Sequence, residues 1–304
     1  MNVLRIDNLY KSFGKEKVIN GLSFEVPENE ILGFLGKNGA GKTTTMKMIL
    51  GFVKPDSGII EVCGEKVEYG FSKTNRFIGY LPDVPNFYGY MTSKEYLMLC
   101  ADITGLQKDY AFRRIEELLK LVGLENNDKR INGFSRGMKQ RLGIAQALIN
   151  KPRILICDEP TSALDPVGRK DILDILNKIK KNTTVIFSTH ILSDVESICD
   201  CVIILDEGKN ILEGSIEELK SIKKINEIVI KFKEKNQSEE FGKKLCLNNI
   251  IYEINDDKII IKNDSNHNIE KRILEQLCIS GFFPIEMKVK ESTLQDIFME
   301  VIKR

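Results

Sequence analysis

The segment GKNGAGKTT at positions 36–44 combines closely spaced glycines with a lysine and two threonines. It fits the pattern G-x-x-x-x-G-K-[ST], follows an apolar run, and opens a stretch with helical spacing of apolar residues. The glycines let backbone N–H groups turn towards phosphate oxygens, and the helix N-terminus adds partial positive charge. The sequence therefore predicts a nucleotide phosphate site formed by Gly36, Lys37, Asn38, Gly39, Ala40, Gly41, Lys42, Thr43 and Thr44.

Two acidic residues supply what a hydrolytic phosphate site needs. Asp158 and Glu159 follow the apolar run ILIC, and together they could be no more than the acidic N-cap of the next helix. Beside the phosphate loop they have defined tasks: Asp158 and the Thr43 hydroxyl hold Mg²⁺, and Glu159 accepts a proton from the attacking water. Lys42 neutralises the β and γ phosphates. The expected cofactors are a nucleoside triphosphate and Mg²⁺.

The elements around these residues indicate an α/β fold. Short apolar runs at 31–36, 153–160, 183–190 and 201–208 end in glycine or polar residues and alternate with helical segments, as in a parallel sheet. Ligands bind at the carboxyl ends of such strands. Runs at 3–6 and 22–26 predict N-terminal strands, and 93–150 is mostly helical in its spacing. We expect a P-loop NTPase with a helical insert.

The texture changes from about Lys220 to a Lys-, Asn- and Ile-rich sequence. Its order β-α-β-β-α-β, followed by a closing helix, predicts a small ferredoxin-like α+β unit. A chain of 304 residues is long enough for two domains. We therefore expect an ATP-binding domain over 1–219, with a helical subdomain at about 90–150, and a C-terminal accessory domain over 220–304.

Composition and charge limit the kinds of partner and the location that we expect. The net charge is +1, with 42% hydrophobic and 29% charged residues, so the sequence gives no reason to expect nucleic acid. The longest apolar stretches, such as 202–205, are far shorter than a membrane span, and the first residues do not resemble a signal peptide. We expect a protein that stays in the cytosol, with its seven cysteines reduced and buried.

Three further segments resemble one family of P-loop NTPases. FSRGMKQ (134–140) resembles the LSGGQ signature of ATP-binding cassette (ABC) proteins, DEPTSALD (158–165) resembles the family's acidic strand and D-loop, and STH (188–190) resembles its H-loop. The resemblance covers about residues 1–215. It implies an ABC ATPase core with an N-terminal antiparallel β region, acting as a head-to-tail homodimer that encloses two ATP molecules.

The resemblance also assigns roles to single residues. Ser135 and Gly137 of one chain would contact the γ-phosphate bound by the other, and Asp165 would help join the two sites. His190 would touch the same phosphate as a catalytic residue beside Glu159. Phe13 occupies the position that resembles the A-loop and would stack on adenine, with Tyr10 as the alternative.

Two residues depart from the family pattern. Arg136 replaces the first glycine of the signature, and Asp83 stands where the Q-loop normally carries glutamine. A carboxylate can bind Mg²⁺ or a water but cannot donate a hydrogen bond as an amide does. Asp83 is therefore a candidate metal contact with a less defined part in sensing ATP.

The resemblance implies a separate integral membrane permease as partner, docked by the aromatic stretch 83–97 with Phe87, Tyr88 and Tyr90 as contacts. The C-terminal extension and the motif GYLPD resemble the bacitracin and multidrug export subgroup. The expected function is ATP hydrolysis that powers export, at the inner face of the cell membrane. The alternative is a regulatory nucleotide switch, which could lack a catalytic carboxylate. A small GTPase is excluded because no N-K-x-D motif accompanies the loop.

Overall fold

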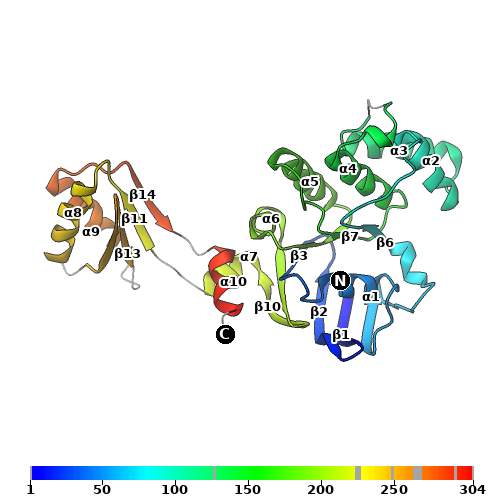
Figure 1. The fold of residues 1–304 in the computed structure, drawn as a ribbon, viewed down its shortest axis with the longest axis horizontal. Helices are drawn as coiled ribbons and strands as arrows, with labels where there is room; N and C mark the ends of the chain where they lie inside the picture. Colours follow the sequence, from blue (N-terminus) through cyan, green and yellow to red (C-terminus); the bar gives the residue numbers. More distant parts are fainter. Residues whose placement is uncertain are drawn as a thin grey trace. The chain divides into compact units, whose positions relative to one another are not determined.

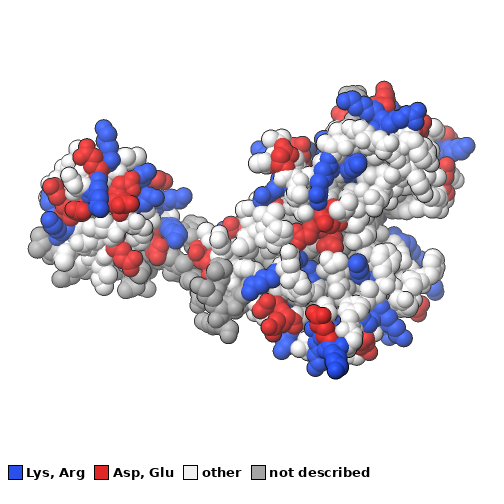
Figure 2. Space-filling model, viewed as in Figure 1, with Lys and Arg blue, Asp and Glu red and all other residues white. Residues whose placement is uncertain are grey.

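The computed structural model describes residues 2–125, 128–222, 227–247, 250–262, 269–290 and 293–302. The chain forms two compact units, 1–216 and 217–304 (Figure 1). Each unit has its own hydrophobic core. On the face shown in Figure 2, acidic and basic side chains are interspersed over both units, in keeping with the near-zero net charge.

A six-stranded sheet forms the centre of the first unit. Its order is β10-β9-β3-β8-β7-β6, with β3 (Ile31–Gly36), β6 (Ile78–Leu81), β7 (Ile154–Asp158), β8 (Thr184–Thr189), β9 (Cys201–Asp206) and β10 (Lys209–Ser215). All neighbours are parallel except β9 and β10. Every residue of β3, β7 and β8 is buried, which explains their continuous apolar sequence. Their carboxyl ends bring the phosphate loop and the acidic pair to one edge.

A second sheet confirms the predicted N-terminal antiparallel β region. Its order is β2-β1-β4-β5, formed by β1 (Asn2–Phe13), β2 (Glu16–Pro27), β4 (Ser57–Val62) and β5 (Glu65–Lys66). In β1 and β2 much of the sequence alternates between buried and exposed residues, because one face packs on the core. The tight β1–β2 hairpin sets Phe13 opposite Glu16. The two sheets together form the α/β core with an N-terminal antiparallel region that the sequence predicts.

Helices surround the two sheets. The phosphate loop opens α1 (Lys42–Ile49), and η1 (Lys73–Phe77) precedes β6. The helical subdomain consists of α2 (Ser93–Ile103), α3 (Lys108–Leu121), η2 (Ile131–Gly133) and α4 (Arg136–Ala147), grouped beside β6 and β7 in Figure 1. Thr92 and Glu95 form a capping box that fixes the start of α2. The helices α5 (Pro166–Ile179) and α6 (Leu192–Ile198) follow β7 and β8. Among the described residues, no helix has the length and hydropathy to cross a bilayer.

The second unit has the expected strand and helix order. It contains β11 (Glu227–Lys231), α8 (Lys235–Leu247), β12 (Tyr252–Asn255), β13 (Lys258–Lys262), α9 (Ile269–Ser280) and β14 (Glu286–Lys290), flanked by α7 (Ile216–Ile222) and α10 (Leu294–Ile302). The antiparallel sheet has the order β12-β13-β11-β14, as a ferredoxin-like unit requires. Ile230, Phe232, Phe241 and Ile259 are fully buried in its core.

The prediction that the cysteines are buried is wrong for most of them. All seven are free thiols, but only Cys157, on the central strand β7, is buried. Cys246 and Cys278 are exposed because they lie on the outward faces of the amphipathic helices α8 and α9. An apolar stretch of sequence in a surface helix does not bury each of its members.

Candidate active site

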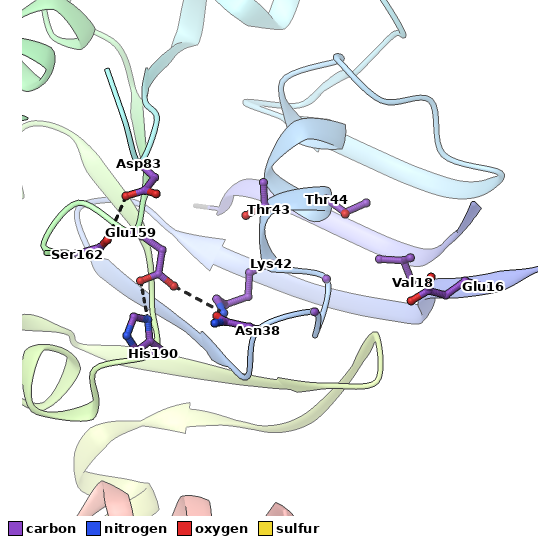
Figure 3. A pocket seen from close by; sticks show the side chains of 12 residues that line it. Glu16, Val18, Asn38, Lys42, Thr43, Thr44, Asp83, Glu159, Ser162 and His190 are labelled. Carbon is purple, nitrogen blue, oxygen red and sulfur yellow. Dashed lines mark hydrogen bonds and ion pairs between the residues drawn. The ribbon is translucent and has the colours of Figure 1, made fainter. Parts of the chain in front are cut away.

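A cavity of about 440 Å³ opens at the carboxyl edge of the central sheet (Figure 3). Most of its wall consists of residues that the sequence predicts as nucleotide contacts. Its lining is Glu16, Val18, Asn38, Gly39, Gly41, Lys42, Thr43, Thr44, Asp83, Glu159, Ser162 and His190. Segments far apart in the chain therefore converge on one polar pocket.

The loop between β3 and α1 has the conformation that phosphate binding requires. Gly39 and Gly41 have φ of 87° and 103°, which lie in the left-handed region. A side chain at Gly41 would place its Cβ 2.5 Å from Ile19 Cδ1, so only glycine fits there. Ala40 is buried beneath the loop. The backbone thus curls tightly around the space that Lys42 faces.

Lys42 is the cation of the pocket. Its Nζ donates to the carbonyl oxygens of Gly36 at 2.7 Å and Lys37 at 3.3 Å, and only 6% of its side chain is exposed. Burial lowers the pKa of Lys42, while the carboxylates of Glu159 and Asp158 oppose that shift. An ammonium held in this way is ready to exchange carbonyl oxygens for phosphate oxygens.

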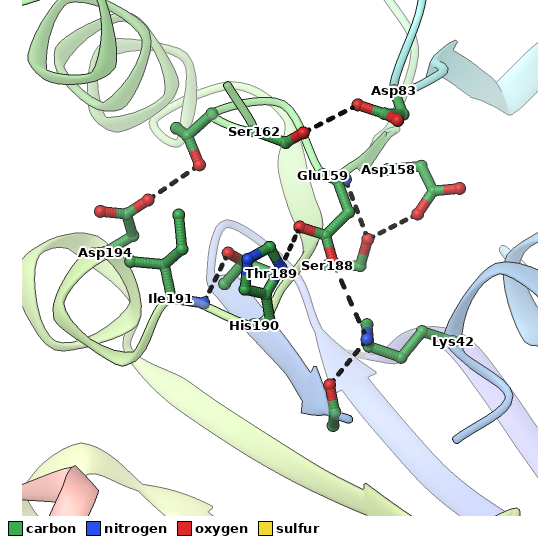
Figure 4. Close-up of polar contacts among 12 residues, drawn as sticks. Lys42, Asp83, Asp158, Glu159, Ser162, Ser188, Thr189, His190, Ile191 and Asp194 are labelled. Carbon is green, nitrogen blue, oxygen red and sulfur yellow. Dashed lines mark hydrogen bonds and ion pairs between the residues drawn. The ribbon is translucent and has the colours of Figure 1, made fainter. Parts of the chain in front are cut away.

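Asp158 is the last residue of β7, and its carboxylate lies beside Ser188 in Figure 4. The Thr43 hydroxyl donates to its carboxylate at 3.0 and 3.2 Å, and the Ser188 hydroxyl donates to Oδ1 at 2.7 Å. The carboxylate is almost completely buried. Thr43 and Asp158 therefore bring hard oxygen donors together, which is the ligand chemistry that Mg²⁺ prefers.

Glu159 faces the pocket from a strained backbone position. Its φ is 48°, a left-handed value that is uncommon for a residue with a side chain, and its N–H donates to Ser188 Oγ at 3.1 Å. One carboxylate oxygen lies 3.8 Å from Lys42 Nζ, and the other lies 2.8 Å from His190 Nδ1. The structure thus brings the proposed base and the proposed phosphate contact together in one polar cluster (Figure 4).

The residues assigned to the opposite chain lie outside the pocket wall. Ser135 is the N-cap of α4 and accepts a hydrogen bond from Met138 N at 3.2 Å. Asp165 caps α5 by accepting from Gly168 N at 3.3 Å. A Cβ at Gly137 would meet only Leu164 Cδ2, at 3.9 Å, so the surface there is open. None of these three is brought to the phosphate loop of its own chain.

The aromatic candidates lie on the hairpin next to the cavity. Phe13 is 51% exposed, with Lys11 Nζ 5.3 Å from its ring centre, and it pairs with the wall residue Glu16. The Tyr10 hydroxyl occupies the space beside Gly21 instead. Of the two aromatic residues, Phe13 is therefore the one whose ring is exposed beside the cavity wall.

Sequence reasoning missed three wall residues. Glu16 and Val18 carry no motif, and their place in the wall comes from the pairing of β1 with β2. Ser162 lies inside the DEPTSALD segment, yet no role for it was predicted. Its hydroxyl donates to Asp83 Oδ1 at 3.2 Å, so the segment after Glu159 is tied to the end of the β6 loop.

Comparison with known proteins decides the family. A model described as ABC transporter matches residues 19–162. The chain is 40% identical to the uncharacterized ABC transporter ATP-binding protein YxlF of Bacillus subtilis (strain 168), over 99% of both chains. This chain belongs to the ABC transporter ATP-binding proteins. It is therefore an ATPase, and the cavity lined by Lys42, Thr43 and Glu159 is its candidate ATP site.

Two other matches of this ABC ATP-binding protein are informative. It is 37% identical to the bacitracin transport ATP-binding protein BcrA of Bacillus licheniformis, over 99% of this chain and 97% of that one. A solved dimeric structure of the ATP-binding cassette MJ0796, in a post-hydrolysis state bound to ADP and Pi, matches with a TM-score of 0.63 and 25% identity, over 70% of this chain and 98% of that one. The matched region covers nearly all of the MJ0796 chain and about the share of this chain that its first unit makes up.

A buried network beside the candidate ATP site fixes the segment after Glu159. Asp194, on α6 and 2% exposed, accepts from Thr161 Oγ1 at 2.8 Å and from Arg169 Nε at 3.0 Å. Thr161 is itself buried. The carboxylate thus joins α5, α6 and the loop that leads from the catalytic strand.

Proposed function

We propose that this chain hydrolyses ATP as a head-to-tail homodimer at the inner face of the cell membrane and thereby powers a separate permease that exports a drug or peptide antibiotic. The observation that carries the proposal is the grouping of Lys42, Thr43, Asp158, Glu159 and His190 around one cavity. The similarity to BcrA along the whole chain supports the export of a peptide antibiotic or a related compound.

Binding of the nucleotide uses the loop and its lysine. The backbone of 36–44 and the N-terminus of α1 receive the phosphates, Lys42 neutralises them, and Phe13 stacks on adenine. Thr43 and Asp158 would hold Mg²⁺, which withdraws charge from the phosphate oxygens when it is bound. The oxygen donors already lie within 3.2 Å of each other, so the residues present fit this ion. Asp83 also lines the cavity and is a further candidate for it.

Hydrolysis needs a base for the attacking water. Glu159 accepts that proton, and the hydrogen bond from its backbone N–H to Ser188 Oγ holds the strained backbone from which its side chain faces the cavity. His190, whose Nδ1 lies 2.8 Å from Glu159 Oε2, holds the carboxylate and would also contact the γ-phosphate. An intact base also argues against a purely regulatory nucleotide switch, the second class of function that the sequence leaves open.

The dimer would complete each site. Ser135 and Gly137 at the start of α4 would reach the γ-phosphate in the partner, and Asp165 would lie at the junction. Exposed N–H groups at a helix start favour anions. The dimeric cassette bound to ADP and Pi supports this arrangement for a fold of the same kind.

The permease would dock beside the helical subdomain. A groove of about 500 Å³ is bordered by Tyr80, Tyr88, Leu99 and Ile103, among others. Tyr88 and Tyr90 are 54% and 61% exposed, which suits partner contacts. Phe87 packs edge-on against Tyr96, with ring centres 5.0 Å apart, so it supports the groove more than it offers a contact.

A susceptibility assay tests this function. Cells lacking the protein are complemented with the wild-type chain or with Glu159→Gln, and growth is measured in bacitracin and in unrelated antibiotics. The proposal expects resistance to one peptide or drug class that only the wild-type chain restores. ATP-driven export of these compounds would be excluded if cells with the wild-type chain and cells with Glu159→Gln were equally resistant. It would also be excluded if cells that lack the protein were as resistant as cells with the wild-type chain.

A further inference from the structure

The two departures from the signature and Q-loop patterns contact each other. Arg136 Nη2 lies 3.3 Å from Asp83 Oδ1 and 3.5 Å from Ser162 Oγ. Asp83 and Ser162 both line the ATP cavity, whereas Arg136 is the first residue of α4. A cation on the signature is thus paired with an anion at the ATP site of the same chain.

The ion pair between Arg136 and Asp83 is weak enough to separate. Its side chains are 43% and 46% exposed, and exposed ion pairs contribute little to stability. The loop that carries Asp83 has a separate anchor, because the buried Gln140 donates to the Asp83 carbonyl oxygen at 2.6 Å. Arg136 can therefore leave the carboxylate without releasing the loop from α4.

Arg136 also has the right chemistry for a phosphate. A guanidinium binds phosphate oxygens with two parallel hydrogen bonds, and it stays charged at any pH at which the protein is folded. Its neighbours in sequence, Ser135 and Gly137, are the residues that the proposed dimer directs at the partner's γ-phosphate. A glycine at this position could offer only its backbone.

We propose that Arg136 is a γ-phosphate ligand acting in trans, and that Asp83 and Ser162 hold its guanidinium in the resting chain. The proposal rests on the head-to-tail dimer of the proposed function. On ATP-driven dimer formation, Arg136 exchanges the Asp83 carboxylate for the partner's phosphate. The arginine in the signature then compensates for the missing glycine by contributing charge to the site.

Mixed dimers separate this role from a contact within one chain. All chains carry Glu159→Gln so that bound ATP is retained, and two affinity tags isolate heterodimers. The first heterodimer combines a Lys42→Ala chain with an Arg136→Gln chain. The second combines a chain carrying both substitutions with a chain carrying neither, so the same residues are changed in both. The readouts are the ATP concentration for half-maximal dimer formation and the ATP retained per dimer.

A trans ligand leaves one complete site in the first heterodimer and none in the second. The second should then need roughly 10-fold to 100-fold more ATP to form, the range expected for loss of a charged hydrogen bond. The reverse order would show that Arg136 acts on its own chain's nucleotide and would overturn the proposal. Equal behaviour of the two, with the ATP-dependent dimer intact, would overturn it while leaving the proposed function standing. Failure of the Glu159→Gln chain itself to dimerise would overturn both.

Single variants check that the effect comes from charge. Arg136→Lys should keep part of the affinity that Arg136→Gln loses, and Arg113→Gln, an exposed arginine on α3, should change nothing. Relative to its effect in the Arg136→Gln background, which includes any loss of a Mg²⁺ contact, Asp83→Asn should lower the half-maximal ATP concentration by about a further two- to fivefold where Arg136 is present, because an exposed ion pair is weak. An equal effect of Asp83→Asn in both backgrounds would contradict the role of Asp83 as the resting partner of Arg136.

Discussion

Lys42 Nζ and Glu159 Oε1 lie 3.8 Å apart, so the cation meant for the phosphates rests beside the carboxylate meant for the water. Each charge partly neutralises the other in a pocket where both side chains are mostly buried. In the proposed reaction, an arriving γ-phosphate would compete with Glu159 for Lys42. The carboxylate would then give up its cation at the stage at which it acts as a base.

Replacing Lys42 with alanine should abolish ATP binding. The loss removes the buried ammonium that the loop holds with two carbonyl oxygens, and the affinity should fall about 100-fold or more. A fluorescent-ATP titration measures this. Lys47→Ala, on the exposed face of the same helix, is the matched control and should bind normally. Unchanged affinity in the Lys42 variant would contradict the assignment of the loop as the phosphate-binding site.

ATP affinity should begin to fall at a lower alkaline pH than it would if Lys42 had the pKa of an ordinary lysine. Burial lowers the pKa of Lys42 below 10.5, and only the protonated amine attracts phosphate. As the pH rises through this lowered pKa, binding weakens and must take up a proton, whereas below that pKa Lys42 adds no pH dependence. Calorimetry in buffers of different ionisation enthalpy reports the proton uptake. No uptake up to pH 10.5 in folded protein would contradict the shift.

Truncating Asp194 to alanine should destabilise the first unit by about 3 kcal/mol, because it leaves the buried Thr161 hydroxyl and the Arg169 cation without their acceptor. Urea unfolding measures the free energy. Asp174→Ala, at an exposed position on α5, controls for loss of an acidic residue and should stay within about 0.5 kcal/mol of the parent. Similar values for both variants would show that the network is not important for stability.

A chain ending at Ser221 should fold and bind ATP with normal affinity, because all residues of the ATP cavity lie within 1–216. The measurement is the same fluorescent-ATP titration, with circular dichroism to show that the product is folded. A stable truncated protein without ATP binding would count against independence of the two units.

Much of the fold could be predicted because local signals agree with it. The continuous apolar runs of β3, β7 and β8 indicate buried parallel strands, and the glycines of the loop are needed for its positive φ values. The order of the C-terminal elements was also legible. The strands β4 and β10 were not predicted. β4 pairs with β1, which lies far earlier in the chain, and β10 is an edge strand without a fully buried residue, so its pattern is weak.

The site could be predicted only as far as motifs reach. Residue type and spacing were enough to predict the roles of the phosphate loop, Asp158 and Glu159. Glu16 and Val18 enter the cavity wall through strand pairing alone. The contact of Arg136 with Asp83 joins residues 53 apart in sequence, and each of them taken singly is only a departure from a pattern.

The most direct test of the account is size-exclusion chromatography of the Glu159→Gln protein with and without ATP and Mg²⁺. The substitution keeps size and hydrogen bonding but removes the base, so ATP should bind and remain unhydrolysed. Each nucleotide would then be clamped between Lys42 of one chain and Ser135 of the other. We expect a monomer without ATP and a dimer with it. A monomer in both samples, despite bound nucleotide, would contradict the sandwich mechanism.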